Sequence, residues 1–478
     1  MGNVSLKNVT VDENVSKINE CAFRGTKIEK IELSGGRADA DTSLTIAMDA
    51  FSDCNHLEDI TGGYRVFEVG WYAFDSCVNL KNMDIGMGLK KIDNAFKGCR
   101  SLRKICLSNK IEDINGEAFS NGACKEFSVE DGSESYKSID GCLYKIVDSE
   151  KDNLKLMYAA NTTDFKYATP ENVTEADMCA FRGRDNIKEI DIGGEIEELS
   201  CYSLINCSNL ETLKLSSKLK SFDRDMTAYS FDNDLTNLKN IIVDEGNTEY
   251  ESYNNELFEK GKKNLILLPY GSDSIVIPKE TEYICGGIAK NKFKNIKVED
   301  GNKYFSVNSN VLYNKDITEI IIFPSYKTTY TLPATLKEFP SMTYRYTEDY
   351  LDIEGEAWIT RADENLECVK VAKGNEVYKA VDGVLYLKNT KQLEYYPPAK
   401  KGSYKIIEGT KYVNNAAFIY TKYLTSLTVP DSVKSIIISP KDSESLEEIT
   451  VPVKCKVIKM TKREGSGVKV YRSLVLKC

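Results

Sequence analysis

Histidine is the scarcest side chain in this sequence among those that could carry out catalysis. His56 is the single histidine among 478 residues. Ser-His-Asp or Cys-His chemistry would therefore need this one residue, and nothing near it resembles the sharp turn that presents a nucleophilic serine. His56 lies between Cys54 and Leu57, just before a predicted strand. We interpret it as a turn or surface residue.

Cysteine is abundant, but its spacing does not indicate a metal site. The chain has 14 cysteines, and no two of them are separated by the two residues that zinc-binding and thioredoxin-like pairs require. With one histidine, the chain also offers too few soft ligands for a histidine-based site. We therefore expect no bound metal and no other cofactor.

The acidic and glycine-containing segments do not complete another catalytic pattern. Neighbouring carboxylates such as Glu197-Glu198 and Glu447-Glu448 are common in an acidic chain, whereas a glycosidase needs two carboxyls at a set separation across a cleft. Asp232-Asn233-Asp234 lacks the glycine and the terminal glutamate of a hand-type calcium loop. Gly465-Ser466-Gly467 is expected to be a polar turn, because no phosphate-binding glycine pattern is present. The sequence predicts a protein that is not an enzyme.

Internal repetition is the dominant feature of the chain. The dipeptide Ala-Phe occurs seven times, with its phenylalanine at Phe23, Phe51, Phe74, Phe96, Phe119, Phe181 and Phe418. From Phe51 to Phe119 the intervals are 23, 22 and 23 residues, within the roughly 20–29-residue period of leucine-rich repeats. A second apolar pair precedes each regular Ala-Phe, as in Leu89-x-x-Ile92.

An apolar segment of the pattern Leu-x-x-Ile-x-Leu follows the Ala-Phe turns. Examples are the segments 80–85, 102–107, 187–192, 210–215 and 424–429. The last two apolar residues lie on one face of a strand, because strand side chains alternate with period two. One such strand cannot bury its apolar face alone. We therefore expect coils stacked about 4.8 Å apart to form a parallel sheet around a shared core, with Ala-Phe on the opposite wall.

A second module recurs four times between the repeats. In its clearest copy, Gly374-Asn375 is followed by Tyr378 and then by Val384-Leu385-Tyr386. An apolar strand containing Tyr or Pro follows each copy about ten residues later. Two strands that flank a polar turn indicate a β-hairpin. The predicted fold is thus a mainly β repeat solenoid: a right-handed leucine-rich-repeat coil with a parallel sheet and interleaved β-hairpin modules.

The hairpins divide the expected solenoid into six consecutive segments. These are leucine-rich repeats over 1–128, a β-hairpin module over 129–170, repeats over 171–245, two β-hairpin modules over 246–335, an irregular segment with a β-hairpin module over 336–400, and C-terminal repeats with a cap over 401–478. We expect one continuous solenoid rather than independent domains.

These features resemble the BspA-like leucine-rich repeats. Ala-Phe-x-x-Cys followed by the apolar strand occurs at 50–60, 73–85 and 95–107. The Asp-Gly-Val-Leu-Tyr hairpin from Asp382, with its later Tyr-Pro at Pro397, also looks like that family. The resemblance implies cell-surface or secreted proteins of host-associated bacteria and some protists, with roles in adhesion to matrix proteins or other cells.

The residues and the family resemblance indicate different compartments. The N-terminus lacks the basic and apolar regions of a secretory signal, and the longest apolar run, Ile320–Phe323, is far below the roughly 18 residues of a spanning helix. We therefore keep two expectations. The first is a cell-surface or secreted adhesion module, and the alternative is an intracellular scaffold, which the missing signal and the many thiols favour.

Charge narrows the class of partner. The net charge is −10 and the pI is near 5.2, which opposes unspecific attraction to nucleic acid or to an anionic membrane. We expect a monomer that binds a protein ligand, with no nucleic acid and no membrane insertion.

The outward residues of the predicted strands are the candidate binding surface. If the solenoid is curved, its parallel strands line the concave side. The third and fifth positions of the pattern point outward, and they hold Lys30, Glu32, Asp59, Thr61, Asn82, Asp84, Lys104, Cys106, Glu189, Asp191, Thr212, Lys214, Asn240 and Ile242. Both charges occur and no aromatic row is present, which favours a protein ligand over a sugar or a single-stranded nucleic acid.

Two further sets of residues have both a structural and a functional interpretation. Tyr136, Tyr250, Tyr304 and Tyr378 could anchor a partner at the hairpin tips, but their fixed position in the module favours hairpin packing. Cys54, Cys77, Cys99 and Cys207 share one repeat position, so we expect a column of small buried groups. Neighbouring coils could bring two such cysteines within disulfide range, yet parallel side chains rarely reach the required torsion, and we predict reduced thiols.

Overall fold

The computed structural model describes most of the chain. The described residues are 6–35, 43–83, 88–115, 117–162, 165–223, 235–269, 271–285, 293–324, 326–339, 343–346, 351–354, 365–418, 421–438, 445–459 and 469–473. Of the sequence predictions, Asp84, Asp232-Asn233-Asp234 and Gly465-Ser466-Gly467 lie outside them. The chain forms two compact units, one built mainly from residues 1–261 and the other mainly from 271–478.

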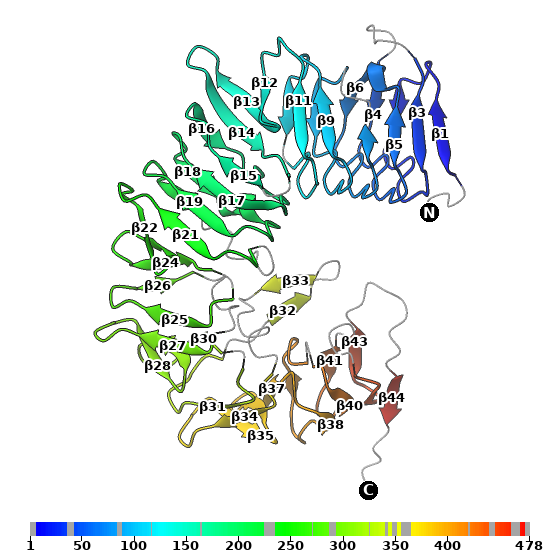
Figure 1. The fold of residues 1–478 in the computed structure, drawn as a ribbon. Coiled ribbons are helices and arrows are strands. Elements are labelled where there is room, and N and C mark those ends of the chain that lie inside the picture. Colours follow the sequence, from blue (N-terminus) through cyan, green and yellow to red (C-terminus); the bar gives the residue numbers. More distant parts are fainter. Residues whose placement is uncertain are drawn as a thin grey trace. The chain divides into compact units, whose positions relative to one another are not determined.

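The first half of unit 1 is a coil with two parallel sheets. The first sheet holds the Leu-x-x-Ile-x-Leu strands β1 (Asn8–Val11), β3 (Lys30–Leu33), β5 (Asp59–Thr61) and β7 (Asn82–Met83), and β9 (Lys104–Leu107) and β11 (Glu126–Val129) pair in the same way. The second sheet holds β2 (Lys17–Ile18), β4 (Leu44–Ile46), β6 (Val66–Val69), β8 (Lys91–Asp93) and β10 (Asp113–Asn115). Figure 1 shows strands of the first sheet side by side in blue.

Side-chain alternation explains why these strands stack. In β3, Ile31 and Leu33 are buried while Lys30 and Glu32 are exposed, and β9 has the same alternation. The buried residues of both sheets meet in one core. The predicted parallel sheet is confirmed, and the second apolar pair of each repeat proves to be a strand of its own.

The Ala-Phe turns close the coil after each strand of the second sheet. Phe23, Phe51, Phe74, Phe96 and Phe119 form a stack with ring centroids 5.1, 5.2, 5.2 and 5.6 Å apart. This spacing follows the roughly 4.8 Å separation of neighbouring parallel strands. Ala50, Ala73, Ala95 and Ala118 are fully buried, whereas Ala22 of the first turn is exposed. The turns bond from coil to coil, as in Phe51 N–H donating to the carbonyl of Ala73 at 2.7 Å.

The second half of unit 1 repeats this arrangement. Its first-sheet strands are β15 (Phe165–Ala168), β17 (Ile187–Ile192), β19 (Thr212–Leu215) and β21 (Asn240–Val243), and its other parallel pair is β18 (Glu198–Ser200) with β20 (Ser221–Asp223). Helical structure among the described residues is confined to the 3-10 segments η1 (Gly63–Arg65) and η2 (Cys201–Leu204).

The predicted hairpins are confirmed. Three of the four contain a third antiparallel strand in addition to the two that were predicted. In the first copy, β12 (Tyr136–Ile139), β13 (Cys142–Asp148) and β14 (Asn153–Tyr158) form an antiparallel meander, and β14 then pairs in parallel with β16 (Val173–Ala176). The later apolar segment is therefore the third strand of the meander. It also returns the chain to the parallel stacking of the solenoid.

The other copies have the same plan. Unit 1 ends with the hairpin of β22 (Tyr250–Tyr253) and β23 (Glu256–Glu259). In unit 2, β28 (Phe305–Asn308), β29 (Val311–Asn314) and β30 (Ile320–Ile322) form one meander, and β35 (Tyr378–Val381), β36 (Val384–Leu387) and β37 (Gln392–Tyr395) form another, which pairs in parallel with β39 (Tyr412–Val413).

Unit 2 is again a set of parallel pairs. They are β25 (Ser274–Ile277) with β27 (Asn295–Val298), β31 (Thr329–Leu332) with β34 (Cys368–Val371), β41 (Ser435–Ile438) with β43 (Lys456–Lys459), and the run β38 (Gly402–Lys405), β40 (Leu424–Thr428), β42 (Glu448–Pro452) and β44 (Lys469–Ser473). The antiparallel hairpin β32 (Thr343–Tyr346) and β33 (Leu351–Glu354) lies in the segment that the repeat pattern does not explain.

Candidate functional site: the outward face of the first sheet

The described candidate residues lie in rows on the outward faces of three parallel sheets, which carry the odd-numbered strands β1–β7, β9–β11 and β15–β21. Strand register places Lys30 beside Asp59 and Asp59 beside Asn82, and it places Glu32 beside Thr61 in the neighbouring row. In the second half of unit 1, Glu189 lies beside Thr212 and Thr212 beside Asn240, while Asp191 lies beside Lys214 and Lys214 beside Ile242. Asp84 is the one candidate of the set outside the described residues.

The charges on this face pair between coils. Lys30 Nζ lies 3.7 Å from Asp59 Oδ2, and Asn82 Nδ2 donates to Asp59 Oδ1 at 2.6 Å. Lys104 Nζ lies 2.7 Å from Glu126 Oε1. We use the term ion-pair ladder for these contacts and for those that Glu189 makes with Lys166 and Lys214. This ladder explains why both charges occur on one face.

The ladder is densest around Glu189. Its carboxylate accepts from Lys214 Nζ at 2.6 Å and lies 3.2 Å from Lys166 Nζ, and Lys214 also lies 3.6 Å from Asp191. The hydrogen bonds from Lys214 and Lys166 lower the pKa of Glu189, and the same contact raises the pKa of Lys214. Asn240 Nδ2 extends the row by donating to Thr212 Oγ1 at 3.3 Å.

Such a ladder holds side chains in place without closing the face to a partner. Pairs this exposed contribute little to stability and are screened by salt, because both charges remain hydrated. A protein ligand can therefore exchange its own charges for one member of a pair. Beside the ladder, Glu32, Thr61, Cys106 and Ile242 are exposed, and Ile242 retains 46% of its accessible surface. The arrangement presents polar and charged groups at fixed spacing, which suits recognition.

The tyrosines of the hairpin modules have a packing role, apart from one. Tyr136, Tyr250 and Tyr378 are buried, and their hydroxyls accept from the backbone N–H groups of Ile114, Phe222 and Phe339 at 2.8, 2.8 and 2.9 Å. The assignment of Tyr304 to the same position is wrong. Phe305 is buried there, three residues after Asn302, and Tyr304 is 43% exposed.

A buried asparagine explains that register. Asn302 Oδ1 accepts from the N–H of Phe305 at 2.8 Å, while its Nδ2 donates to the carbonyls of Pro278 and Thr281. Asn247 and Asn375 accept in the same way from the N–H groups of Tyr250 and Tyr378. The residue three positions after the asparagine is therefore fixed in the hairpin core, whatever aromatic side chain occupies it.

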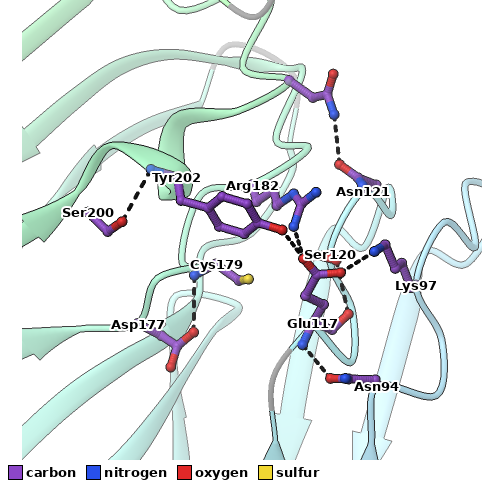
Figure 2. Close-up of polar contacts among 11 residues, drawn as sticks. Asn94, Lys97, Glu117, Ser120, Asn121, Asp177, Cys179, Arg182, Ser200 and Tyr202 are labelled. Atoms are coloured by element: carbon purple, nitrogen blue, oxygen red, sulfur yellow. Dashed lines mark hydrogen bonds and ion pairs between the residues drawn. The ribbon is translucent and has the colours of Figure 1, made fainter. Parts of the chain in front are cut away.

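Sequence reasoning missed a polar cluster centred on Glu117 (Figure 2). The Glu117 carboxylate contacts the ammonium of Lys97, the guanidinium of Arg182 and the hydroxyl of Tyr202. Its backbone N–H donates to Asn94 Oδ1 at 2.6 Å, and the guanidinium carbon of Arg182 lies 4.0 Å from the Tyr202 ring centroid. The sequence did offer one indication of this cluster: Glu117 directly precedes one Ala-Phe pair and Arg182 directly follows the next.

The cluster joins turns that are far apart in sequence. Glu117 precedes Ala118-Phe119 and Arg182 follows Ala180-Phe181, with the first hairpin module between them. Asn121 N–H also donates to the Arg182 carbonyl at 3.3 Å. The Glu117 carboxylate is paired within the chain by two cations and one hydroxyl group (Figure 2). We interpret the cluster as a connection between coils and not as a reactive site.

The cysteine column is a regular structural feature. Cys54, Cys77, Cys99 and Cys207 are buried, and each Sγ donates to the carbonyl of the phenylalanine one coil earlier, at 3.0, 3.2, 3.3 and 3.0 Å. Burial raises the pKa values of the Cys54, Cys77 and Cys99 thiols. A thiol therefore serves here as a small apolar group that can also donate. That these thiols are reduced remains a prediction.

Two searches of the described residues bear on other classes of function. Within the described ranges, no group of three or more His, Cys, Asp or Glu side chains is arranged to hold a metal ion. None of the helical segments there is long and apolar enough to cross a membrane.

Two-sheeted coils, stacked strand upon strand and interrupted by hairpins, define the chain as a mainly β parallel solenoid. The family model described as "BspA type Leucine rich repeat region (6 copies)" matches residues 1–40, 39–145, 159–264 and 400–462. These matches cover more than half of the chain, so the chain belongs to the BspA-type leucine-rich repeat family. The resemblance predicted from the sequence is confirmed.

Several solved structures are similar to this chain. A leucine-rich repeat protein from Eubacterium ventriosum is 13% identical, with 88% of this chain and 85% of that chain covered and a TM-score of 0.35. A leucine rich cell surface protein from Faecalibacterium prausnitzii is 13% identical, with coverages of 94% and 92% and a TM-score of 0.27. The pneumococcal vaccine antigen PcpA is 16% identical, with coverages of 98% and 80% and a TM-score of 0.21. Among curated proteins, none matches the chain.

Proposed function

We propose that this chain is a non-catalytic protein-binding module that attaches a cell to host or neighbouring-cell proteins, from the cell surface or in secreted form. The observation that carries the proposal is the ladder face, defined as the outward side of the first sheet in unit 1. It offers charged and polar groups in strand register on a rigid backbone. The family resemblance supports the proposed adhesion and surface location, which it implies but does not establish for this chain.

Recognition by this face depends on position as much as on charge. Lys104 and Asp191 lie in different halves of unit 1, and each is held by the strand that carries it. A protein ligand with complementary charges could contact one row without disturbing the core, because the buried residues point the other way. Partners of this kind associate with a salt-dependent rate.

A binding screen tests the proposal. The purified chain would be presented to extracellular-matrix proteins and to intact cells, beside a variant carrying Lys104→Glu and Asp191→Arg. We expect saturable binding that this variant loses. Binding that survives the two reversals would move the site away from the ladder face, and no binding across the panel would contradict adhesion.

An intracellular scaffold is the second candidate. The observation in its favour is that Cys21 and Cys106 are exposed free thiols, which persist more readily in a reducing compartment. Protease treatment of intact cells that make the protein separates the two candidates. Cleavage of the chain by external protease supports the surface module, whereas full protection supports the scaffold.

A further inference from the structure

An exposed apolar pair lies on the two turns that lead into Ala50-Phe51 and Ala73-Phe74. Met48 and Trp71 keep 42% and 48% of their accessible surface. They belong to neighbouring coils, because Asp49 N–H donates to the Trp71 carbonyl at 2.9 Å. The Tyr72 ring meets the Trp71 ring edge-on, with centroids 6.0 Å apart. Two aromatic rings and a thioether are therefore presented together at the end of the second sheet.

The two turns also approach each other closely at Gly70. Gly70 lies between β6 and Trp71, and a Cβ on Gly70 would stand only 3.2 Å from the N atom of Met48. The position two residues before Ala95 is occupied by Asp93, which is buried and pairs with Lys91 at 3.0 Å. The equivalent positions Met48 and Trp71 are thus apolar and open, where the next coil is polar and covered.

Three carboxylates flank the apolar pair on the same two turns. Asp49 and Asp53 belong to the coil of Met48, and Asp75 belongs to the coil of Trp71. Asp53 N–H donates to the Asp75 carbonyl at 2.9 Å, which places these turns side by side. We call Met48, Trp71, Tyr72, Asp49, Asp53 and Asp75 the Trp71 patch.

The acids of the patch have few cations near them. Arg24 bridges Asp49 and Asp53 at 3.3 and 3.5 Å. Burial raises the pKa of Asp75, and the hydrogen bond from Ser76 Oγ at 3.0 Å and the charge of Lys97 oppose the shift, while Asp53 and Asp49 add smaller contributions that raise it. Lys97 itself is engaged by Glu117.

This pattern differs from that of the ladder face. There, acids such as Glu126 and Glu189 have lysine ammonium groups within 2.6–3.2 Å on the neighbouring coil. In the Trp71 patch, three carboxylates share one bridging arginine beside the exposed Trp71 ring and the half-buried Tyr72 ring. A cation from a partner would lower the repulsion between the carboxylates, and the ring faces would attract it further.

We propose that the Trp71 patch binds an arginine side chain of a protein partner. A planar guanidinium can stack on the indole while its N–H groups donate to the flanking carboxylates, which an ammonium or a neutral side chain does less well. Met48 gives apolar contact to the residue next to that arginine. This surface is separate from the ladder face, so the two proposals can fail independently.

Trp71 provides its own probe. The chain has two tryptophans, so Trp358→Phe leaves Trp71 as the sole tryptophan fluorophore. The titrants would be the peptide Gly-Arg-Leu-Arg-Gly, the same peptide with citrulline in place of both arginines, and a neutral oligosaccharide. Citrulline has nearly the shape of arginine without its charge, so the pair isolates the cation.

We expect a saturable fluorescence change with the arginine peptide and binding about tenfold weaker with the citrulline peptide. Calorimetry should show that Trp71→Ala removes this binding and that Asp49→Asn with Asp75→Asn weakens it severalfold and reduces its salt dependence. As the matched control, Tyr412→Ala removes an exposed ring that keeps 59% of its surface in unit 2, and it should leave binding unchanged.

Three results would overturn the proposal. They are equal binding of the two peptides, binding that persists in Trp71→Ala, and the absence of saturable binding by the arginine peptide. A response to the oligosaccharide alone would also overturn it and assign the patch to sugar recognition. Thermal unfolding of each variant verifies folding, and little change is expected because Trp71 and Tyr412 are exposed and the two aspartates are replaced by asparagines of the same shape.

Discussion

At the scale of single residues, the buried thiols pack in the core of the solenoid and have low reactivity. The Sγ of Cys77 lies in the core and donates to the Phe51 carbonyl, which also accepts from the backbone N–H of Cys54, so the buried thiol has a partner for its proton. Desolvation raises the pKa of this thiol well above its ordinary value. The reactive thiolate is therefore suppressed.

Alkylation tests this contrast between thiols. In the native protein at pH 8, iodoacetamide should label the exposed Cys21 and Cys106 and leave Cys77 and Cys99 unmodified. After denaturation without reductant, all four should react. Mass spectrometry of the peptides measures the labels. A buried pair that reacts only after reduction would show a disulfide and contradict the predicted reduced column.

Glu256 is a second residue whose burial has a measurable consequence. It is 7% exposed, its Oε2 has no hydrogen-bond partner, and burial raises its pKa from 4.5 to about 7. Equivalent hairpin positions in unit 2 hold Val311 and Val384. A carboxyl with a higher pKa in the folded state binds its proton more tightly there, so stability falls as pH rises from about 4.5 to about 7.

Glu256→Val should therefore raise the free energy of unfolding at pH 8 by about 2–3 kcal/mol, and by clearly less at pH 5. Urea unfolding of both proteins at the two pH values measures the difference. An equal effect at pH 5 and pH 8 would mean that the charge of Glu256 is not what destabilises the wild-type hairpin.

At the scale of elements, the Glu117 cluster shows how the solenoid accommodates an inserted hairpin. The turn at Gly183 must approach the turn at Asn121 directly, because a Cβ on Gly183 would lie 2.3 Å from the Asn121 Cα. Gly183 also has a φ of 75°. Both conditions favour glycine, so the close approach of these turns depends on one residue.

Gly183→Ala should destabilise unit 1 by about 3 kcal/mol, because it adds a backbone clash to the cost of a left-handed conformation. Gly261→Ala separates the two causes. Gly261 has a φ of 78°, and its Cβ would meet nothing within 4 Å. That control should lose only about 1 kcal/mol. Equal losses in denaturant unfolding would contradict the packing of the two turns.

The sequence predicts elements of this fold to different degrees. The strand face of Ile60 and the core position of Phe74 follow from period-two alternation and the 23-residue repeat. The strand Val66–Val69 was not predicted, because a short apolar pair shows too little alternation to distinguish a strand from a turn. Tyr304 was misplaced by one residue, because the buried asparagine that sets the register is recognisable only from its contacts.

For the candidate site, the sequence predicts which face a residue lies on but not which residue it pairs with. Alternation alone places Lys30 and Asp59 on the outward face, and the structure has them there. Their pairing depends on which coils are neighbours, and so do the contacts of Glu117 with residues 65 and 85 positions away. The neighbourhood of Trp71 and Met48 likewise depends on which turns lie side by side. No local pattern in the sequence carries such information.

At the scale of the whole molecule, each unit is built by stacking, and every coil contributes a few outward side chains at fixed positions. The chain has 63 basic and 73 acidic residues, which gives the net charge of −10. On the ladder face of unit 1, acidic side chains are paired with lysines. A surface of this kind favours a folded protein ligand over a nucleic acid. We expect the chain to be a monomer, which sedimentation at several concentrations would verify.

The most direct test of the ladder face compares a single with a double charge reversal. Lys104→Glu breaks the contact with Glu126, whereas Lys104→Glu combined with Glu126→Lys restores an ion pair of opposite direction. The measurement is the affinity for the protein ligand retained by the screen, with the unfolding midpoint of each variant beside it. We predict that the unfolding midpoint changes little in either variant, because the pair is exposed, and that the double reversal does not recover the affinity, because the ligand contacts each charge at its own position. Affinity that returns in the double reversal would contradict recognition by this face and leave the ladder a purely structural role.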